Sequence, residues 1–479
     1  MSDRIGTEIT VPRVATALGE VFADAGHELH LVGGPVRDAI LRRASDDLDF
    51  ATSARPEETL AILKQHGSTT WTTGQAFGTI GAVFRGNRVE VTTFRADSYD
   101  RVSRNPTVAY GDNLVDDLRR RDFTINAMAV SLPGNEFSDP FDGIGDLARR
   151  VIRTPTAPEE SFADDPLRMM RAARFAAQLE FDVDADVRQA MTDMATDLDR
   201  ITPERIRDEF VKLMGGVDPV IGLRMLVDTG LADRFMPELS ALRMAIDEHA
   251  QHKDVYEHTL TVVRNAVELE DDGPDTTLRI AALLHDIGKP DTKGVSPSGR
   301  VTFHHHELVG ARMARKRLRA LRFSKDETAE ICELIALHLR FYGYGRGEWT
   351  DSAVRRYVTD AGPYLPRLHK LVRSDCTTRN KRKAMRLAAD YDALEARIDR
   401  LAAEEDLAKV RPDLDGNEIM RLLNLPPGRE VGQAWKHLKE VRLERGPLTR
   451  EAAETELFAW AAAQGIEVPG QVSADSSDS

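Results

Sequence analysis

The hydrophobic pattern of the chain changes near residue 160, and no other feature constrains the fold as strongly. Before that point, short runs rich in Val, Ile, Thr and Phe, or bounded by glycine, are typical of β-strands, as in residues 29–32 and 48–52. From about Ser161 onward apolar residues recur at helical spacing, as Leu167 and Met170 do. The pattern predicts an α+β fold, with a mixed-sheet head followed by a remainder that is almost wholly α-helical.

Within the head, apolar periodicity and glycines predict individual elements. Gly26 is a favoured helix-ending residue, and Gly86-Asn87 is the expected turn of a β-hairpin. The expected elements are a helix over 9–26, a strand over 29–32, a helix over 36–41, a strand over 48–52, and hairpin strands over 79–85 and 88–94.

Length and charge exclude some classes of protein. Since domains usually run roughly 100–200 residues, a chain of 479 residues predicts three or four compact units. A net charge of −14 argues against a protein that coats nucleic acid nonspecifically, because such binding depends on phosphate neutralisation. A local basic groove remains compatible with that charge, and a solvated helix face is the alternative for any basic run. The basic side chains that crowd together are Arg379, Lys381, Arg382, Lys383 and Arg386.

The composition is that of a soluble globular protein, with 41% hydrophobic and 30% charged residues. No run approaches the roughly 20 apolar residues of a membrane span. The first residues lack the basic and apolar regions of an export signal, so we expect a cytoplasmic protein. Two cysteines, Cys332 and Cys376, are too few for a disulfide framework and fit a reducing compartment.

Two glycines and a spaced pair of aspartates form the first candidate site. Gly33 and Gly34 lie at a predicted strand-to-helix turn, where backbone N–H groups can approach a triphosphate. Residues i and i+2 of a strand share a face, so Asp47 and Asp49 present two carboxylates side by side. Such a pair repels itself unless a hard cation such as Mg²⁺ lies between. Glu90, on the predicted neighbouring strand, is the candidate third carboxylate. The alternative interpretation of Asp47 and Asp49 is an exposed acidic turn, which is the more common setting of an isolated Asp-x-Asp.

The order of several longer motifs favours the catalytic interpretation. These motifs comprise residues 33–38, 47–52, 89–95, 120–127, 139–146, 164–168 and 203–209. Over residues 28–215 the series strongly resembles the bacterial class II tRNA nucleotidyltransferase and poly(A) polymerase family. The resemblance implies a polymerase-β-like nucleotidyltransferase head, with Mg²⁺ at Asp47 and Asp49 and the two-metal chemistry of polymerases.

The same resemblance implies a set of nucleotide contacts. Arg120, Arg121 and Asp122 are expected to contact the ribose and triphosphate, because guanidinium groups suit phosphate oxygens and a carboxylate can accept from a ribose hydroxyl. Asn126 is expected to position this turn. The implied nucleotide-binding residues are Gly33, Gly34, Arg37, Arg120, Arg121, Asp122, Asn126, Asp165, Arg168, Arg171 and Arg174.

Asp165 and Arg168 are the implied base-reading pair. They are three apart on one predicted helix and would project from one face, where a surface salt bridge is the alternative. In the family the matching pair acts as a protein template for the base. Cytosine and adenine both offer an exocyclic amine beside an unprotonated ring nitrogen, so an acceptor next to a donor fits only these two bases. Asp164 stands where many relatives have Glu, a change that keeps the carboxylate.

A second set of metal-binding residue types lies in the helical half. Over residues 250–395 it resembles the His…His-Asp…Asp series of HD phosphohydrolases. The candidate ligands are His258, His285, Asp286 and Asp375, with His306 and His338 as auxiliary ligands. His304 or His305 could replace His306, and residues 283–289 are expected to form a helix that ends at Gly288. Imidazole and carboxylate ligands admit Mn, Ni, Fe or Mg. The resemblance implies a metal-dependent phosphohydrolase, with a site kept only for packing as the alternative.

Together these features predict a multidomain RNA-modifying enzyme. The predicted parts are a nucleotidyltransferase head over 1–152, a helical base-reading neck over 153–215, a helical HD body over 216–395, a C-terminal helical region over 396–466 and a disordered tail over 467–479. The leading function is addition of C, C and A to the tRNA 3′ end from CTP and ATP. The expected partners are tRNA and these nucleotides, and no membrane is expected. Alternatives are a poly(A) polymerase, an enzyme that adds only CC or only A, an HD phosphohydrolase with an RNA-binding head, and a noncatalytic RNA-binding module.

Overall fold

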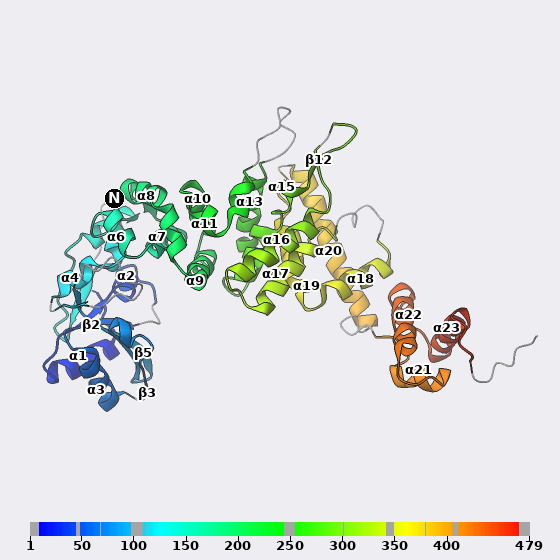
Figure 1. Ribbon diagram of the computed structural model, residues 1–479, viewed down its shortest axis with the longest axis horizontal. Coiled ribbons are helices and arrows are strands. Elements are labelled where there is room, and N and C mark those ends of the chain that lie inside the picture. The colour runs from blue at the N-terminus through cyan, green and yellow to red at the C-terminus, as the bar shows by residue number, and fades with distance from the viewer. Residues whose placement is uncertain are drawn as a thin grey trace, which may run out of the picture. The chain divides into compact units, whose positions relative to one another are not determined.

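The computed structural model describes residues 9–44, 48–67, 69–96, 109–111, 113–243, 254–299, 301–341, 349–378, 380–405 and 411–468. The chain divides into two compact units, Met1–Ser240 and Ala241–Ser479 (Figure 1). The predicted boundaries at residues 152, 215, 395 and 466 within these units stay predictions.

The head of the first unit is built on a mixed sheet of seven strands in the order β3-β4-β5-β2-β1-β8-β9. β2 and β5 run parallel, and the other neighbouring strands run antiparallel. The strands are β1 (Leu29–Val32), β2 (Leu48–Thr52), β3 (Thr69–Trp71), β4 (Thr79–Phe84), β5 (Asn87–Thr93), β8 (Ala129–Leu132) and β9 (Phe137–Ser138). The bounds of β1 and β2 agree with those predicted from the sequence.

Two helices, α1 (Arg13–Asp24) and α3 (Pro56–His66), pack against this sheet. Gly19 of α1 lies so close to β8 that a Cβ there would be 2.4 Å from the Cβ of Leu132. Leu132 pairs with Leu29, so α1 covers the face of the sheet that buries Leu29 and Leu31. The helix predicted over 9–26 is present but shorter: it begins after Pro12 and ends at Asp24.

The β4–β5 hairpin turns one residue earlier than predicted. Its loop residues are Arg85 and Gly86, with φ of 49° and 81°, and Phe84 pairs with Asn87. Positive φ at both loop residues is the type I′ geometry, whose twist matches that of the flanking strands. The asparagine expected in the turn is therefore the first residue of β5.

The remainder of the first unit is mostly helical. Short paired strands are β6 (Arg95–Ala96) with β7 (Ala109–Tyr110), and β10 (Val151–Ile152) with β11 (Asp182–Val183). The helices are α2 (Gly34–Ile40), α4 (Leu114–Arg119), α5 (Gly143–Arg149), α6 (Pro158–Asp164), α7 (Leu167–Leu179), α8 (Ala185–Asp193), α9 (Pro203–Met214), α10 (Pro219–Asp228), α11 (Leu231–Phe235) and α12 (Pro237–Ala241), with 3-10 turns η1 (Gln75–Phe77), η2 (Thr124–Asn126) and η3 (Ala195–Arg200). The expected α+β class is confirmed.

The second unit is helical apart from one hairpin that the sequence did not predict, β12 (Lys293–Val295) with β13 (Val301–Phe303). Its helices are α13 (Val255–Glu268), α14 (Thr276–Leu284), α15 (Lys289–Thr292), α16 (His306–Ala320), α17 (Lys325–Leu337), α18 (Asp351–Ala361), α19 (Leu365–Ser374), α20 (Lys381–Glu404), α21 (Gly416–Leu423), α22 (Arg429–Arg445) and α23 (Arg450–Ala463), with a 3-10 turn η5 (Gly362–Tyr364). The last three helices share a core of their own around Leu438 and Leu457. No helix in the described parts of the chain is long and apolar enough to cross a membrane.

The helix predicted to end at Gly288 ends instead at Leu284. Gly288 is a point of close approach to α16, because a Cβ there would be 2.3 Å from the carbonyl oxygen of His306 and 2.6 Å from the nitrogen of Gly310. The predicted tail, 467–479, lies outside the described residues except for its first two.

Candidate functional site

The acidic part of the first site lies on the face of the head sheet opposite α1. Asp49 in β2 and Glu90 in β5 are direct partners in the parallel register. Their neighbours Leu48, Phe50, Val89 and Val91 are all buried on the other face. Because neighbouring strands lie about 4.8 Å apart, this register brings the two carboxylates close together. Asp47, the other predicted metal ligand, lies outside the described residues.

Gly33 joins β1 to α2 in a left-handed backbone conformation that favours glycine. Its φ is 74°, and a Cβ there would be 2.8 Å from Nη1 of Arg121. Arg121 also lies 3.3 Å from Oδ2 of Asp117, a buried carboxylate. The glycine thus allows a guanidinium group to lie against the backbone at the end of β1.

A chain of hydrogen bonds links the predicted nucleotide-binding residues. Arg37 donates to Oδ1 of Asn126 at 2.7 Å, and Asn126 donates to Oδ1 of Asp122 at 3.0 Å. Arg171 donates to Oδ2 of Asp122 from Nε at 2.8 Å and from Nη2 at 2.5 Å. Burial opposes ionisation of Asp122, but the charge and hydrogen bonds of Arg171, with the bond from Asn126, hold the pKa of this carboxyl well below its usual range. Both oxygens of Asp122 are therefore engaged inside the protein.

Three guanidinium groups gather around one ring that the sequence analysis did not single out. The ring centroid of Phe175 lies 5.2 Å from Arg37, 5.5 Å from Arg171 and 4.2 Å from Arg174. Glu209, also missed as a site residue, lies 3.6 Å from Arg171 and 3.0 Å from Arg174. Burial lowers the pKa of Arg174 to about 10, with the nearby charge of Arg171 acting in the same direction. The available signal for Glu209 was its position in the 203–209 motif.

The prediction that Asp165 and Arg168 lie on one helix is wrong. α6 ends at Asp164 and α7 begins at Leu167, since proline at 166 disfavours the helical conformation of the residue before it. Oδ2 of Asp165 accepts from Arg205 at 2.8 Å. Arg168 donates to Oγ of Ser161 at 2.8 Å and to the carbonyl oxygen of Arg120 at 2.5 Å. The two side chains therefore belong to adjacent segments and do not pair with each other.

The second unit brings all six predicted metal-binding residues together. They form two groups, His258, His285 and Asp375 in one and Asp286, His306 and His338 in the other, and within each group the ligand atoms lie within 4.8 Å of one another. Oδ2 of Asp286 lies 3.5 Å from Nε2 of His258 and 3.2 Å from Nε2 of His285, and its Oδ1 lies 3.2 Å from Nε2 of His306. His304 and His305 are exposed, whereas His306 is buried beside Asp286.

A contact made by Nδ1 of each histidine orients the other ring nitrogen, Nε2, toward the carboxylates. Nδ1 of His285, His306 and His338 lies 2.7, 2.8 and 2.6 Å from the carbonyl oxygens of Ala282, Phe303 and Ile335, respectively. Nδ1 of His258 lies 2.9 Å from Oγ1 of Thr377. These contacts leave the Nε2 atoms facing inward, as in metal sites where the outer nitrogen of each histidine is held by a carbonyl or carboxylate.

The electrostatics of this centre fit a cation. Burial opposes ionisation of Asp286, but the charge of His285 and hydrogen bonds outweigh it, so the pKa of this carboxyl lies well below its usual range. Burial and the neighbouring His285 lower the pKa of His338 to about 4. Nε2 of His285 is buried and lies 3.2 Å from Oδ2 of Asp286 and 3.6 Å from Oδ1 of Asp375, without a well-aligned hydrogen bond to either within the described residues. Lys289, which the sequence analysis missed, lies with Nζ 2.5 Å from Oδ2 of Asp286.

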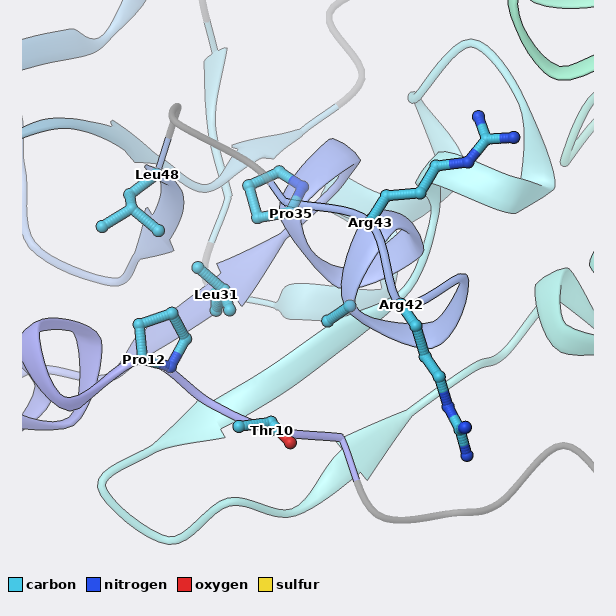
Figure 2. A pocket seen from close by; sticks show the side chains of 8 residues that line it. Thr10, Pro12, Leu31, Pro35, Arg42, Arg43 and Leu48 are labelled. Atoms are coloured by element: carbon cyan, nitrogen blue, oxygen red, sulfur yellow. The ribbon is translucent and has the colours of Figure 1, made fainter.

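A separate hollow of about 290 Å³ lies at the edge of the head. Figure 2 shows Leu31, Pro12 and Leu48 at one side of it, with the guanidinium groups of Arg42 and Arg43 pointing away from them. Leu31 and Leu48 belong to the face of the sheet opposite Asp49 and Glu90. The hollow is therefore not part of the carboxylate site.

Family models match three stretches of the chain. These are the poly A polymerase head domain over residues 29–153, the probable RNA and SrmB-binding site of polymerase A over residues 180–242, and the HD domain over residues 255–402. A mixed-sheet head with paired carboxylates, followed by a helical unit with a His/Asp centre, defines a nucleotidyltransferase joined to an HD domain.

Known relatives agree with that class. The A-adding tRNA nucleotidyltransferase of Deinococcus radiodurans is 32% identical over 437 residues, which cover 90% of this chain and 95% of that protein. The CCA-adding enzyme of Lactobacillus johnsonii is 43% identical over 227 residues, 47% of this chain and 56% of that protein, so the match spans about half of its length. The crystal structure of the Bacillus stearothermophilus CCA-adding enzyme in complex with CTP has a TM-score of 0.66 and 25% identity, covering 95% of this chain and 99% of that chain. This chain belongs to the class II CCA-adding enzyme and poly(A) polymerase family with an HD domain.

Proposed function

We propose that this protein adds C, C and A to the 3′ end of tRNA from CTP and ATP. The observation that carries the proposal is the direct pairing of Asp49 with Glu90 on the face of the head sheet opposite α1. A close pair of carboxylates suits a hard divalent cation, and Asp47 is the expected further ligand. Mg²⁺ held there would activate a ribose 3′-hydroxyl and stabilise the departing pyrophosphate. A tRNA substrate would place the protein in the cytoplasm.

The arginines nearby would bind the triphosphate. Arg121 lies against Gly33 at the end of β1, and Arg37 is held by Asn126. Guanidinium groups form paired hydrogen bonds with phosphate oxygens, which an ammonium group cannot match. Asp122 is buried and has both oxygens engaged, so we assign it to orienting Arg171 and Asn126 rather than to a ribose contact.

Selection of the base would rest on Asp165 and Arg168. The backbone N–H of Arg168 donates to the carbonyl oxygen of Asp165 at 3.0 Å, which keeps the two residues adjacent although they lie in different segments. A carboxylate acceptor next to a guanidinium donor complements the amine and ring nitrogen shared by cytosine and adenine. Guanine and uracil present a carbonyl beside a ring N–H. Their carbonyl acceptor would then face the carboxylate acceptor, and their N–H donor would face the guanidinium donor.

Addition of A alone, addition of CC alone and poly(A) synthesis are the alternatives within the family, and the A-adding relative favours the first of these. The test uses tRNA transcripts that lack the last three, two or one nucleotides, each supplied with a single nucleotide. The proposal requires C to be added to the first two transcripts and A to the third. Addition of A only to the third transcript would identify an A-adding enzyme, and long A tails would identify a poly(A) polymerase.

We further propose that the second unit is a metal-dependent phosphohydrolase. Nε2 of His285 is buried and lies between the carboxylates of Asp286 and Asp375, an arrangement of ligand atoms that supports a bound divalent cation. His258, His285, Asp286 and Asp375 would hold it, and the cation would supply the Lewis-acid chemistry that hydrolysis of a phosphoester needs. Ligands of these types accept Mn, Ni, Fe or Mg. Candidate substrates are 2′,3′-cyclic phosphates and 2′-phosphates, lesions that block addition at a damaged tRNA end.

A further inference from the structure

The face of the head sheet that carries the carboxylates continues past them onto β4 and β3. In the strand register, Glu90 pairs with Asp49 on one side and with Gly81 on the other, and Gly81 pairs with Trp71. Directly paired residues point to the same face of a sheet. Trp71, Gly81, Glu90 and Asp49 therefore form one row across four strands, on the face that carries the proposed catalytic carboxylates.

Gly81 allows the indole of Trp71 to lie over β4, next to the strand of Glu90. A Cβ at Gly81 would be 2.0 Å from both Nε1 and Cε2 of Trp71. These atoms are ring atoms directly over the glycine backbone, so any side chain at position 81 would displace the ring. The indole thus covers β4, the strand next to Glu90, instead of projecting outward from β3.

A cation accompanies this ring. Arg88 lies two residues before Glu90 on β5 and so shares its face, and its guanidinium group is 5.1 Å from the centroid of Trp71. Arg88 is exposed, and no carboxylate in the described part of the chain lies within ion-pair distance of it. Arg37 and Arg171, by contrast, are each paired with an aspartate. The charge of Arg88 therefore remains available to an anion.

An aromatic ring with a cation available at its face suits a nucleotide. Bases stack on aromatic side chains and guanidinium groups, and the cation binds the phosphate backbone. In phosphoryl transfer the attacking and leaving oxygens lie roughly in line with the phosphorus between them. Gly33 and Arg121 lie at the end of β1, on one side of the carboxylates, whereas Trp71 lies on β3, on the other side, and Arg88 lies on β5 between Trp71 and the carboxylates. The attacking 3′-hydroxyl must then approach from the side of Trp71.

We propose that Trp71 and Arg88 form an acceptor platform that binds the 3′-terminal nucleotide of the RNA. The terminal base stacks on the indole of Trp71 in place of the guanidinium group of Arg88, which moves from the ring to a phosphate of the same strand. The inference rests on the proposed function of the carboxylate site, since it assigns the acceptor side of that reaction. It explains why a glycine occupies position 81.

The test measures binding and turnover separately. A tRNA transcript with 2-aminopurine as its terminal base is mixed with the full-length protein, with Trp71→Ala, Trp71→Phe and Arg88→Gln. Arg85→Gln is the matched control, because Arg85 lies on the same hairpin and 5.4 Å from a ring centroid, that of Phe84, which is buried on the opposite face. Loss of one stacking partner is expected to raise KM for tRNA roughly tenfold in Trp71→Ala, with KM for CTP and ATP unchanged.

Quenching of 2-aminopurine should be strong with the parent protein and with Arg85→Gln, partial with Trp71→Phe and absent with Trp71→Ala. In Arg88→Gln the slope of log KM for tRNA against log salt should fall by about 0.7, the value for one phosphate of a single strand. Quenching that persists in Trp71→Ala, or an equal rise of KM for nucleotide and tRNA in both variants, would overturn the platform. The quenching needs no catalysis, so a parent protein that quenches the probe but incorporates no nucleotide would contradict the proposed function and support the platform.

Discussion

At the scale of single residues, the arginines of the first site are held in place by carboxylates of the protein itself. Asp122 holds Arg171 through two hydrogen bonds, and Glu209 lies beside both Arg171 and Arg174. Phe175 packs against the same guanidinium groups. Groups that are already fixed lose less conformational entropy when a ligand binds, so this arrangement favours orientation of a nucleotide.

Replacement of Asp49 by Asn should abolish addition of both C and A. The amide keeps the size of the side chain but removes the charge that a divalent cation requires, so we expect kcat to fall at least about 100-fold. Binding of tRNA should change little, as measured by a gel-shift titration. Asp186→Asn, an exposed change on α8, is the control. Near-normal turnover of Asp49→Asn would contradict the assignment.

Replacement of Arg168 by Ala should damage selection of the base more than binding of phosphate. Loss of a charge-assisted hydrogen bond costs about 1.5–3 kcal/mol, which corresponds to roughly a 10- to 150-fold loss of discrimination. Competition of UTP and GTP against CTP and ATP measures it. Arg188→Ala, an exposed arginine of α8, serves as control. Discrimination as sharp as that of the parent would exclude the templating role.

At the scale of elements, backbone approach decides where helices begin and end. Pro166 separates α6 from α7, which places Asp165 in the link and Arg168 in the helix. Gly288 affects the metal centre in a different way. It allows α16, which begins at His306, to lie against the segment that follows α14. Both residues therefore set the relative positions of functional side chains near them in the sequence.

Two glycine-to-alanine changes should have opposite effects on stability. A Cβ at Gly288 would meet backbone atoms at 2.3 and 2.6 Å, so Gly288→Ala should destabilise the second unit by about 1–3 kcal/mol and weaken metal binding. A Cβ at Gly432, in α22, would meet no atom of the described residues within 4 Å, so Gly432→Ala should stabilise by about 0.5–1 kcal/mol. Thermal unfolding and metal titration measure both. Unchanged stability and metal affinity of Gly288→Ala would contradict the close-approach argument.

At the scale of the whole molecule, the two sites lie in different units. The carboxylates and arginines of the first site belong to Met1–Ser240, and the His/Asp centre belongs to Ala241–Ser479. Each unit has its own buried core. We therefore expect changes in one site to leave the chemistry of the other nearly unaffected.

Replacement of Asp286 by Ala should remove metal-dependent hydrolysis of 2′,3′-cyclic phosphates while CCA addition stays almost unchanged. The carboxylate of Asp286 lies within 3.5 Å of His258, His285 and His306, and its loss leaves their Nε2 atoms without a shared anionic partner. Asp291→Ala, an exposed change on α15, is the control. If the parent protein hydrolyses no such phosphate with Mg²⁺, Mn²⁺ or Ni²⁺, the second unit is a structural platform instead.

Much of the fold could be predicted because it depends on local patterns. Short apolar runs define β2, and a helical period defines α7. The errors occurred where a contact from elsewhere in the chain or a single imino acid changed the outcome. The helix before Gly288 ended early beside α16, and the helix predicted across Asp165 was interrupted at Pro166.

The sequence alone determined the α+β class, the residue types of both sites and the face of β2 that carries Asp49, because each follows from neighbours within a few positions. The tertiary structure decided which distant groups meet. It set the register of Asp49 against Glu90, the bond between Asp122 and Arg171, and the row from Trp71 across Gly81. Strand register and helix packing depend on how whole surfaces fit together, and the periodicity of a short stretch of sequence does not specify that fit.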